Sequence, residues 1–249
     1  MRHQHNLGLA PRLMWRAALA LALGVGIFAT SAEAAYTTGN LVVDPSFENN
    51  PLIPFVLILG PPFTSGAWGA ESATISGTSD GITPASGSLM LNMTDDGLVA
   101  TQAFQFVDVT AYTADINAGI VSVDASALYN VPAAITAGVS SVNVGFYDAS
   151  HSLLGNIATS SNTLGGGFVD SNVNTWQALN VVAAPLPFGT QYILMQAAYG
   201  NASMIDQSGL PRSGYVDDAR LSLTAVPEPS TIVLAGLGLL GALAMRKRR

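Results

Sequence analysis

Apolar and polar side chains alternate with a period of two through most of residues 100–224, and this pattern constrains the fold more than any other feature. In the range 100–109, for example, Phe104 and Phe106 fall on one face while Val107 and Val109 fall on the other. Successive side chains of a β-strand point to opposite faces, so this period predicts strands. No sustained helical period of 3.6 occurs between residues 35 and 225, which argues against long helices there.

The alternating segments are separated by turn residues, as expected for an all-β protein. Asn40 to Glu48 is expected to form a short strand running into a turn. Four prolines in residues 51–62 predict a loop or an irregular edge of a sheet. The Gly, Ser and Asn content of residues 160–174 predicts a loop. Trp68 lies among small residues and is expected to fill the core. The other predicted strands cover residues 88–92, 100–109, 119–129, 142–146, 153–158, 175–182, 189–199 and 213–224.

These strands favour one antiparallel β-sandwich of the jelly-roll type over residues 35–225. The N-terminal segment reads as a signal helix. It carries arginines and no acid up to residue 16, an apolar run over 17–30, and then Ala32-Glu33-Ala34. We expect signal peptidase to cut after Ala34, and the alternative is a retained N-terminal anchor helix.

The last segment, residues 226–249, has three parts. A Pro227-Glu228-Pro229 turn precedes an apolar run from Ile232 to Met245, and the chain ends in four basic residues, Arg246, Lys247, Arg248 and Arg249. As a helix, the apolar run would be about 21 Å long at ~1.5 Å per residue, shorter than the ~30 Å hydrocarbon core of a membrane. Taken alone, it predicts a hydrophobic helix that is a marginal membrane span, with its basic end in the cytoplasm.

Charge excludes one class of partner. Between residues 35 and 225 there are two basic side chains, Arg212 and Arg220, and fourteen acidic ones, which gives a formal charge of −12. Such a body would be repelled by nucleic acid. Because the chain has no cysteine, disulfides, thiolate metal sites and thiol nucleophiles are also excluded.

One carboxylate stands out as a candidate metal ligand. Strict alternation from Tyr215 to Leu223 places Asp217 on the same face as Ala219 and Leu221, the predicted core face. A buried carboxylate needs a cation or several hydrogen-bond donors, since burying it alone costs several kcal/mol. With Glu48 as a second ligand, oxygen-only coordination would favour a structural Ca²⁺ ion. The alternative is that Asp217 accepts backbone N–H bonds at a sheet end.

Catalysis finds little support in the residues. His151 is the one histidine of the body, it falls in a predicted turn, and no Gly-x-Ser-x-Gly motif accompanies it. We therefore expect no enzyme and no cofactor site. The alternative is a glycoside hydrolase, because two of the fourteen acidic residues could converge in the fold.

The last segment, with Pro227-Glu228-Pro229, the apolar run and the basic end, resembles the PEP-CTERM sorting signal of Gram-negative bacteria that make exopolysaccharide. The resemblance implies recognition and cleavage by a membrane-embedded exosortase, and release to the cell surface or the extracellular matrix.

The body resembles the galactose-binding-like jelly rolls of carbohydrate-binding modules. The similar segments are Asn40 to Glu48, Ser86 to Leu91, Thr175 to Gln177 and Tyr215 to Leu221. The resemblance implies a structural Ca²⁺ near the first and last strands, which would suit Glu48 and Asp217. Together these features predict a secreted, non-catalytic protein that is a structural or polysaccharide-binding component of the exopolysaccharide matrix.

Overall fold

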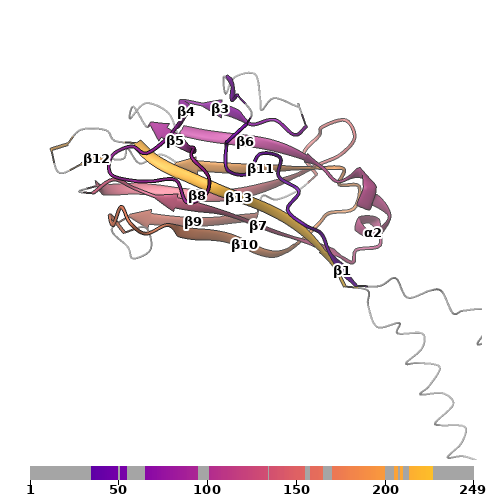
Figure 1. Cartoon of the computed structure of the whole chain (residues 1–249). Coiled ribbons are helices and arrows are strands. Elements are labelled where there is room, and N and C mark those ends of the chain that lie inside the picture. The colour runs from indigo at the N-terminus through magenta and orange to yellow at the C-terminus, as the bar shows by residue number, and fades with distance from the viewer. Residues whose placement is uncertain are drawn as a thin grey trace, which may run out of the picture. The chain divides into compact units, whose positions relative to one another are not determined.

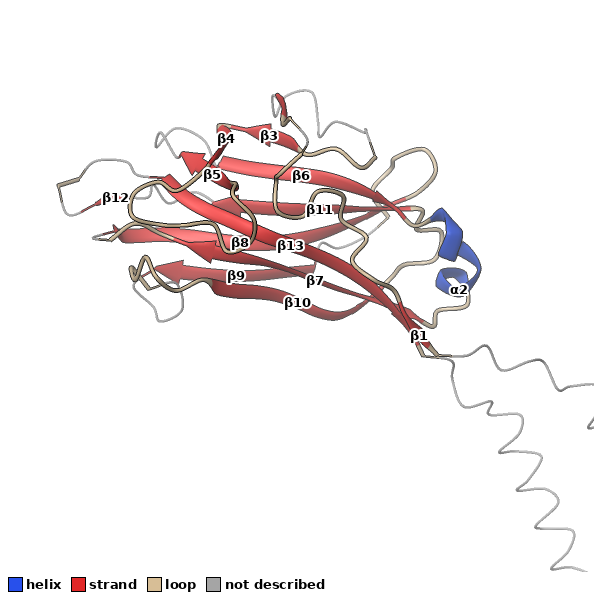
Figure 2. Cartoon of the chain, viewed as in Figure 1, coloured by secondary structure: helices blue, strands red, loops and turns tan. Residues whose placement is uncertain are grey.

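Two β-sheets pack face to face over residues 36–225 and form a β-sandwich (Figures 1 and 2). The computed structural model describes residues 35–49, 51–54, 65–94, 101–133, 135–154, 158–164, 170–199, 205–206, 208–209 and 213–226. The all-β sandwich predicted from the sequence is confirmed. The predicted signal helix at 1–34 and the predicted hydrophobic helix after Ile232 lie outside the described residues, and the predicted domain boundaries stay predictions.

The described residues contain thirteen strands, one short α-helix and one 3₁₀ turn. In chain order they are β1 (Tyr36–Thr37), β2 (Ile53–Pro54), β3 (Gly69–Glu71), β4 (Ala73–Ser76), β5 (Met90–Thr94), β6 (Thr101–Asp108), η2 (Thr110–Tyr112), α2 (Thr113–Asn117), β7 (Val121–Asn130), β8 (Ile135–Tyr147), β9 (Ala158–Leu164), β10 (Gln177–Pro185), β11 (Tyr192–Tyr199), β12 (Ile205–Asp206) and β13 (Ser213–Ala225). Within the described part of the chain, no helix is both long enough and apolar enough to cross a membrane.

Each sheet draws its strands from distant parts of the sequence. The first sheet has the order β10-β7-β13-β5-β4, and β1 pairs with β13. The second has the order β12-β8-β11-β6-β3-β2, and β9 pairs with β8. The named strands pair antiparallel, except that β2 runs parallel to β3. Tyr36 of β1 pairs with Ala225 of β13, so the two ends of the body lie side by side (Figure 1).

The core lies between the sheets and follows the alternation. In β7 every second side chain from Val121 to Tyr129 is buried, and in β11 the same holds from Ile193 to Tyr199. Each fully buried Val, Leu, Ile, Phe or Met side chain contributes about 1.5–3 kcal/mol to stability. Trp68, 1% exposed, fills the core as predicted, and its indole Nε1 donates to the Asp44 carbonyl at 3.1 Å.

The sequence predicts a short strand running into a turn from Asn40 to Glu48. The structure has the turn but no strand before it. Asp44 and Phe47 have φ angles of 50° and 58°, which a strand does not allow. The Asp44 carboxylate stabilises the turn by accepting the backbone N–H groups of Glu48 and Asn49.

The interpretation of residues 160–174 as a loop is also partly wrong. Ala158–Leu164 forms β9, which pairs with β8 from Val144↔Ala158 to Gly138↔Leu164. Its sequence, Ala-Thr-Ser-Ser-Asn-Thr-Leu, has no apolar alternation, so the period-two signal could not reveal it. An edge strand can be this polar because its pairing comes from the backbone.

A β-bulge interrupts β13 and changes the face of Asp217. The pairing with β7 shifts register between Asp217 and Arg220, and Asp218 has a φ of 47°. Before the bulge, Asp217 lies opposite Leu128, on the outer face of the sheet. The prediction that Asp217 shares the core face with Leu221 is therefore wrong, because the extra residue of a bulge shifts the alternation by one.

Candidate functional site

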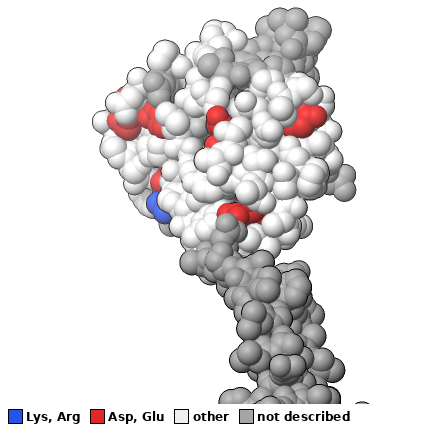
Figure 3. Space-filling model, turned by 90° about the vertical axis from the view of Figure 1, so that its right-hand side faces the viewer, with Lys and Arg blue, Asp and Glu red and all other residues white. Residues whose placement is uncertain are grey.

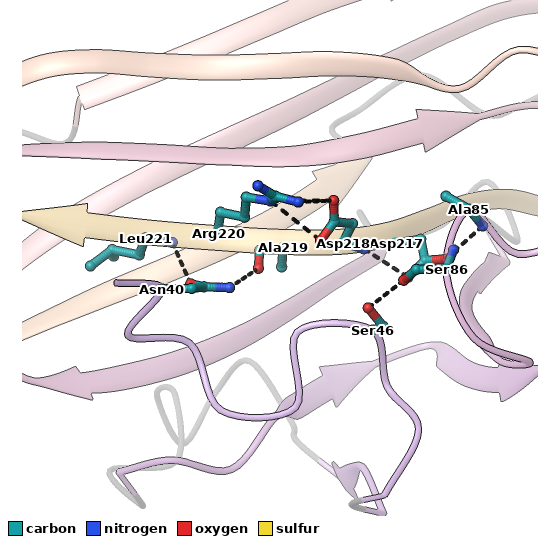
Figure 4. A network of polar contacts seen from close by, with 9 residues as sticks. All are labelled: Asn40, Ser46, Ala85, Ser86, Asp217, Asp218, Ala219, Arg220 and Leu221. Atoms are coloured by element: carbon teal, nitrogen blue, oxygen red, sulfur yellow. Dashed lines mark hydrogen bonds and ion pairs between the residues drawn. The ribbon is translucent and has the colours of Figure 1, made fainter. Parts of the chain in front are cut away.

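The two predicted metal ligands bind the same loop on the outer face of the first sheet. Asp217 is fully buried there, and its Oδ2 accepts the backbone N–H groups of Ala85 at 2.7 Å and Ser86 at 3.0 Å (Figure 4). Its Oδ1 accepts the N–H of Asp218 at 2.7 Å. Burial raises the pKa of Asp217 to about 6, although the three N–H donors act in the opposite direction.

Glu48 binds the next residues of the loop. Its Oε1 accepts the backbone N–H groups of Ser88 at 2.8 Å and Leu89 at 2.7 Å, and its Oε2 accepts the Ser88 hydroxyl at 3.2 Å. The N–H of Leu89, and then that of Ser88, lower the pKa of Glu48. A hydrogen bond of 2.6 Å between the hydroxyls of Ser46 and Ser86 adds a third tie to residues 85–89, which we call the clamped loop.

This donor set does not fit a cation. A Ca²⁺ site needs six to eight oxygen ligands, but both carboxylates here face N–H groups, which cannot ligate a metal. The described residues contain no group of three or more His, Cys, Asp or Glu side chains able to hold a metal ion. The geometry agrees with the alternative for Asp217, a carboxylate satisfied by backbone donors. Calcium binding by Glu48 and Asp217 stays a prediction without support from the geometry.

A second cluster lies on the outer face of the second sheet, at one end of β6, β8 and β11. The half-buried rings of Tyr192 and His151 lie 4.7 Å apart, centroid to centroid, at an interplanar angle of 32°. Phe106 packs edge-on against Tyr147, with ring centroids 5.1 Å apart, and Leu194 completes the cluster. We call Phe106, Tyr147, His151 and Tyr192 the aromatic cluster.

A row of polar side chains crosses the same face. Gln102 Nε2 donates to Glu71 Oε2 at 2.8 Å, and Gln196 Nε2 donates to Gln102 Oε1 at 2.6 Å. Asn143 Nδ2 then donates to Gln196 Oε1 at 2.7 Å and to Ser141 Oγ at 3.1 Å. This amide row therefore runs across β3, β6, β11 and β8. Each strand contributes one residue, except that β8 contributes both Asn143 and Ser141.

The cross-strand register places the amide row beside the aromatic cluster. Tyr192 pairs with Tyr147 at the start of β11, and Gln196 pairs with Asn143 four residues further on. Tyr192 and Gln196 therefore share one face, as do Tyr147 and Asn143 on β8. All four side chains are half-buried, so each keeps part of its surface exposed to solvent.

This combination suits a sugar chain. The C–H groups of a pyranose ring can pack on an aromatic face, while its hydroxyls exchange hydrogen bonds with amide and hydroxyl side chains. Sequence reasoning missed the face, because the parity of each strand shows which residues share a side but does not show which strands are neighbours. Only the pairing of β8 with β11 and of β11 with β6 brings these residues together.

His151 contributes to the packing of the aromatic cluster. It lies in the turn after β8 with a φ of 59°, and its ring contacts Tyr192 and Phe106. The neighbouring Asp148 carboxylate accepts hydrogen bonds from Ser150 and Ser152 within the turn, which lower the pKa of Asp148. None of these contacts pairs His151 with a serine as a general base would require.

The predicted sorting residues, Pro227, Glu228, Pro229 and the basic end, lie outside the described residues. Residues 225–249 match the family model described as the PEP-CTERM protein-sorting motif, as the sequence predicted. No curated protein matches the chain.

Several solved carbohydrate-binding modules are similar to the chain. A CBM61 module, TmCBM61 solved with β-1,4-galactotriose, is 12% identical with a TM-score of 0.46, over 74% of this chain and 98% of that one. The CBM22-1 xylan-binding domain of Paenibacillus barcinonensis Xyn10C is 13% identical with a TM-score of 0.45, over 77% and 99% of the two chains. A third structure, the enzymatically active domain of bacteriophage CBA120 tailspike protein 4, is 11% identical with a TM-score of 0.42, over 73% and 21%.

Proposed function

We propose that this protein is a secreted, non-catalytic glycan-binding protein that is sorted to the cell surface through its C-terminal motif. The observation that carries the binding function is the aromatic cluster, with Tyr147, His151 and Tyr192 half-buried, beside the amide row on the outer face of the second sheet. The match of residues 225–249 to the PEP-CTERM motif supports the sorting step.

In this proposal the chain is exported by residues 1–34, cut by signal peptidase, and held transiently in the membrane by the apolar run from Ile232 to Met245. An exosortase-type enzyme then cuts near Pro229 and releases the body to the surface or the exopolysaccharide matrix. Fractionation of the native host, with mass spectrometry of the C-terminal peptide, tests this sequence of steps. A mature protein that ends in Arg249 would contradict the processing step.

On the candidate face, Tyr192 and Tyr147 would contact the apolar side of a sugar ring, and Asn143, Ser141 and Gln196 would bond its hydroxyls. Of the described carboxylates on this face, Glu71 accepts a hydrogen bond from Gln102, and Asp108, which pairs with Tyr192, accepts the Thr110 N–H. A glycosidase needs two carboxylates about 5–10 Å apart across the scissile bond. The described contacts of the face therefore favour binding over hydrolysis.

Binding is tested by affinity electrophoresis and calorimetry of the protein with soluble neutral polysaccharides, including xylan, galactan and mixed-linkage glucan. We expect Tyr192→Ala to weaken binding about tenfold, because an aromatic contact of ~1.4 kcal/mol corresponds to that factor. Trp176→Ala is the matched control, since Trp176 is a half-buried aromatic on the first sheet that donates to the Thr83 carbonyl. Equal losses in both variants, or measurable turnover of a polysaccharide, would contradict the proposal.

A further inference from the structure

In the amide row on the second sheet, the hydrogen bonds from Asn143 to Glu71 all point the same way, from each amide NH₂ group toward Glu71, and Glu71 determines this direction. An ionised carboxylate only accepts hydrogen bonds, so Glu71 requires the NH₂ group of Gln102 to point toward it. The carbonyl oxygen of Gln102 must then face Gln196, and it accepts a hydrogen bond from the NH₂ group of Gln196. Each amide orientation follows from the previous one, which resolves the usual ambiguity between the oxygen and nitrogen of an amide.

The direction determines what the exposed end of the row offers. Asn143 uses its NH₂ group to bond Gln196 Oε1 and Ser141 Oγ, so both N–H groups are occupied. Its Oδ1 accepts no hydrogen bond from the described residues, and Asn143 is half-buried. Toward solvent, Asn143 therefore presents an acceptor.

The charge of the described surface also disfavours an anionic ligand. Arg220 is the one Lys or Arg among the described residues, it lies on β13 of the first sheet, and it forms an ion pair with Asp218 at 2.7 Å. Figure 3 shows separate acidic side chains and one small basic patch on a face of the body that otherwise carries no charged side chains. No described cation is therefore placed to neutralise a uronate or sulfate on the second sheet.

We infer that the amide row, oriented by Glu71, makes this face select neutral, hydroxyl-bearing glycans and reject anionic ones, with Glu71 as a positioning residue for Asn143. The inference rests on the proposed function, because it names the class of ligand for the same face. A sugar hydroxyl can donate to Asn143 Oδ1, whereas a carboxylate or sulfate can only accept and meets a second acceptor there.

Replacing Glu71 by glutamine removes the acceptor-only end of the row. The new side-chain amide can donate as well as accept, so the row of amides can reverse and Asn143 can offer an N–H to the ligand. We expect Glu71→Gln to bind anionic glycans better relative to neutral ones. The matched control is Asp108→Asn, which removes one negative charge from the same face, because Asp108 lies at the exposed end of β6 and pairs with Tyr192. Asp108 takes no part in the hydrogen bonds of the amide row. The asparagine keeps an oxygen for the Thr110 N–H that Asp108 accepts.

The experiment measures affinities of the whole protein for two pairs of probes, xylan with carboxymethyl xylan and β-glucan with carboxymethyl β-glucan, at low and high salt. We expect the wild type to bind a neutral form at least about tenfold tighter than its carboxymethyl partner, since an unpaired acceptor facing an anion costs ~1.4 kcal/mol or more. Glu71→Gln should narrow that ratio several-fold more than Asp108→Asn, and the difference should persist in high salt, which screens general repulsion.

The outcomes separate the two proposals. Binding of a neutral form with equal binding of its carboxymethyl partner, or identical ratios in Glu71→Gln and Asp108→Asn, would overturn this inference and leave the proposed function standing. Failure of the wild type to bind either form of either polymer would overturn the proposed function and this inference with it. Melting curves of both variants verify that each remains folded.

Discussion

Gly214 shows how closely single residues pack inside the sandwich. The buried ring of Tyr199 lies across Gly214, so that a methyl group there would overlap the Tyr199 ring atoms. The ring cannot move aside easily, since the Tyr199 hydroxyl donates to the carbonyls of Tyr215 and Asn130 at 3.3 and 3.4 Å. Position 214 requires a glycine for lack of space and not for backbone conformation, since the φ of Gly214 is not in the left-handed region.

We therefore expect Gly214→Ala to lower the free energy of unfolding by about 1–3 kcal/mol, the usual cost of overpacking a core. Gly39→Ala is the control, since a methyl group at Gly39 meets no atom within 4 Å. Urea denaturation of both variants measures the difference. A Gly214→Ala protein as stable as Gly39→Ala would show that the Tyr199 ring can relocate without loss.

Asp217 gives the protein a predictable pH dependence. Burial raises its pKa in the folded state to about 6, above the ordinary value of 3.8, so the folded protein binds the proton more tightly than the unfolded chain. The contribution of Asp217 to stability therefore increases as the pH falls from about 7 toward 4 and decreases as the pH rises through 6.

The measurement is the difference in unfolding free energy between the wild type and Asp217→Asn, taken from pH 4.5 to pH 7. We expect this difference to change in favour of the wild type at the lower pH, by at most about 3 kcal/mol at 1.36 kcal/mol per pKa unit. Other titrating groups cancel in the comparison. A difference that is flat with pH would contradict the raised pKa. Glu48, with its lowered pKa, acts oppositely: its contribution is lost at lower pH, as the pH falls below its ordinary value of 4.5.

At the scale of elements, the clamped loop at residues 85–89 depends on Gly87. Gly87 has a φ of 63°, and a methyl group there would overlap the Glu48 carboxylate. Two effects therefore oppose an alanine: left-handed backbone strain of about 1–2 kcal/mol, and the displacement of Glu48 from Ser88 and Leu89. Gly119 isolates the first effect, because its φ is 74° and no atom lies within 4 Å of an added methyl group.

We expect Gly87→Ala to destabilise the protein more than Gly119→Ala does, by thermal or urea denaturation. The excess should disappear when Gly87→Ala is made in a Glu48→Ala background, because the carboxylate that the methyl group displaces is then absent. An excess that survives in that background would assign the loss to some contact other than Glu48.

The strands themselves show how far the sequence predicts such elements. Alternation correctly indicated β6, β7, β10, β11 and β13, because in each of these strands apolar residues that pack in the core recur at alternate positions. It failed in β13 at Asp217, where one bulge residue with positive φ, Asp218, reverses the face. The bulge contains neither glycine nor asparagine. Its aspartate is a residue type enriched at positive φ, but aspartates also occur in regular strands, so the alternation alone does not reveal it.

The candidate face was less predictable, for a different reason. Tyr192 and Gln196 are four residues apart, and their common face follows from the period alone. Their neighbours Tyr147 and Asn143 lie about fifty residues earlier in the chain and come into contact through the register of β8 with β11. Such pairing depends on the whole topology, which hydrophobic period does not encode.

At the scale of the molecule, the question of a structural cation can be settled by melting. The clamped loop satisfies Glu48 and Asp217 with N–H donors, so we expect a chelator such as EDTA to leave the Tm of the protein unchanged. A Tm that falls with EDTA and recovers with added Ca²⁺ would show that the two carboxylates, or other residues, hold a cation. If Asp217→Ala abolished that response, the calcium prediction made from the sequence would be correct.

The pairing of β1 and β13 also has a mechanical consequence. β13 is thirteen residues long, is bordered by β7 and β5, and leads directly into Val226, so a pull on the C-terminal end loads a central strand along its length. Its backbone bonds to β7 are then sheared together, whereas a pull on β1 peels residues 36–41 away from β13, one after the other. A body held at its C-terminal end by the cell and on the second sheet by a polymer would resist traction far better than one held at its N-terminal end. Single-molecule pulling from residue 143 against either end of the body would measure the two rupture forces.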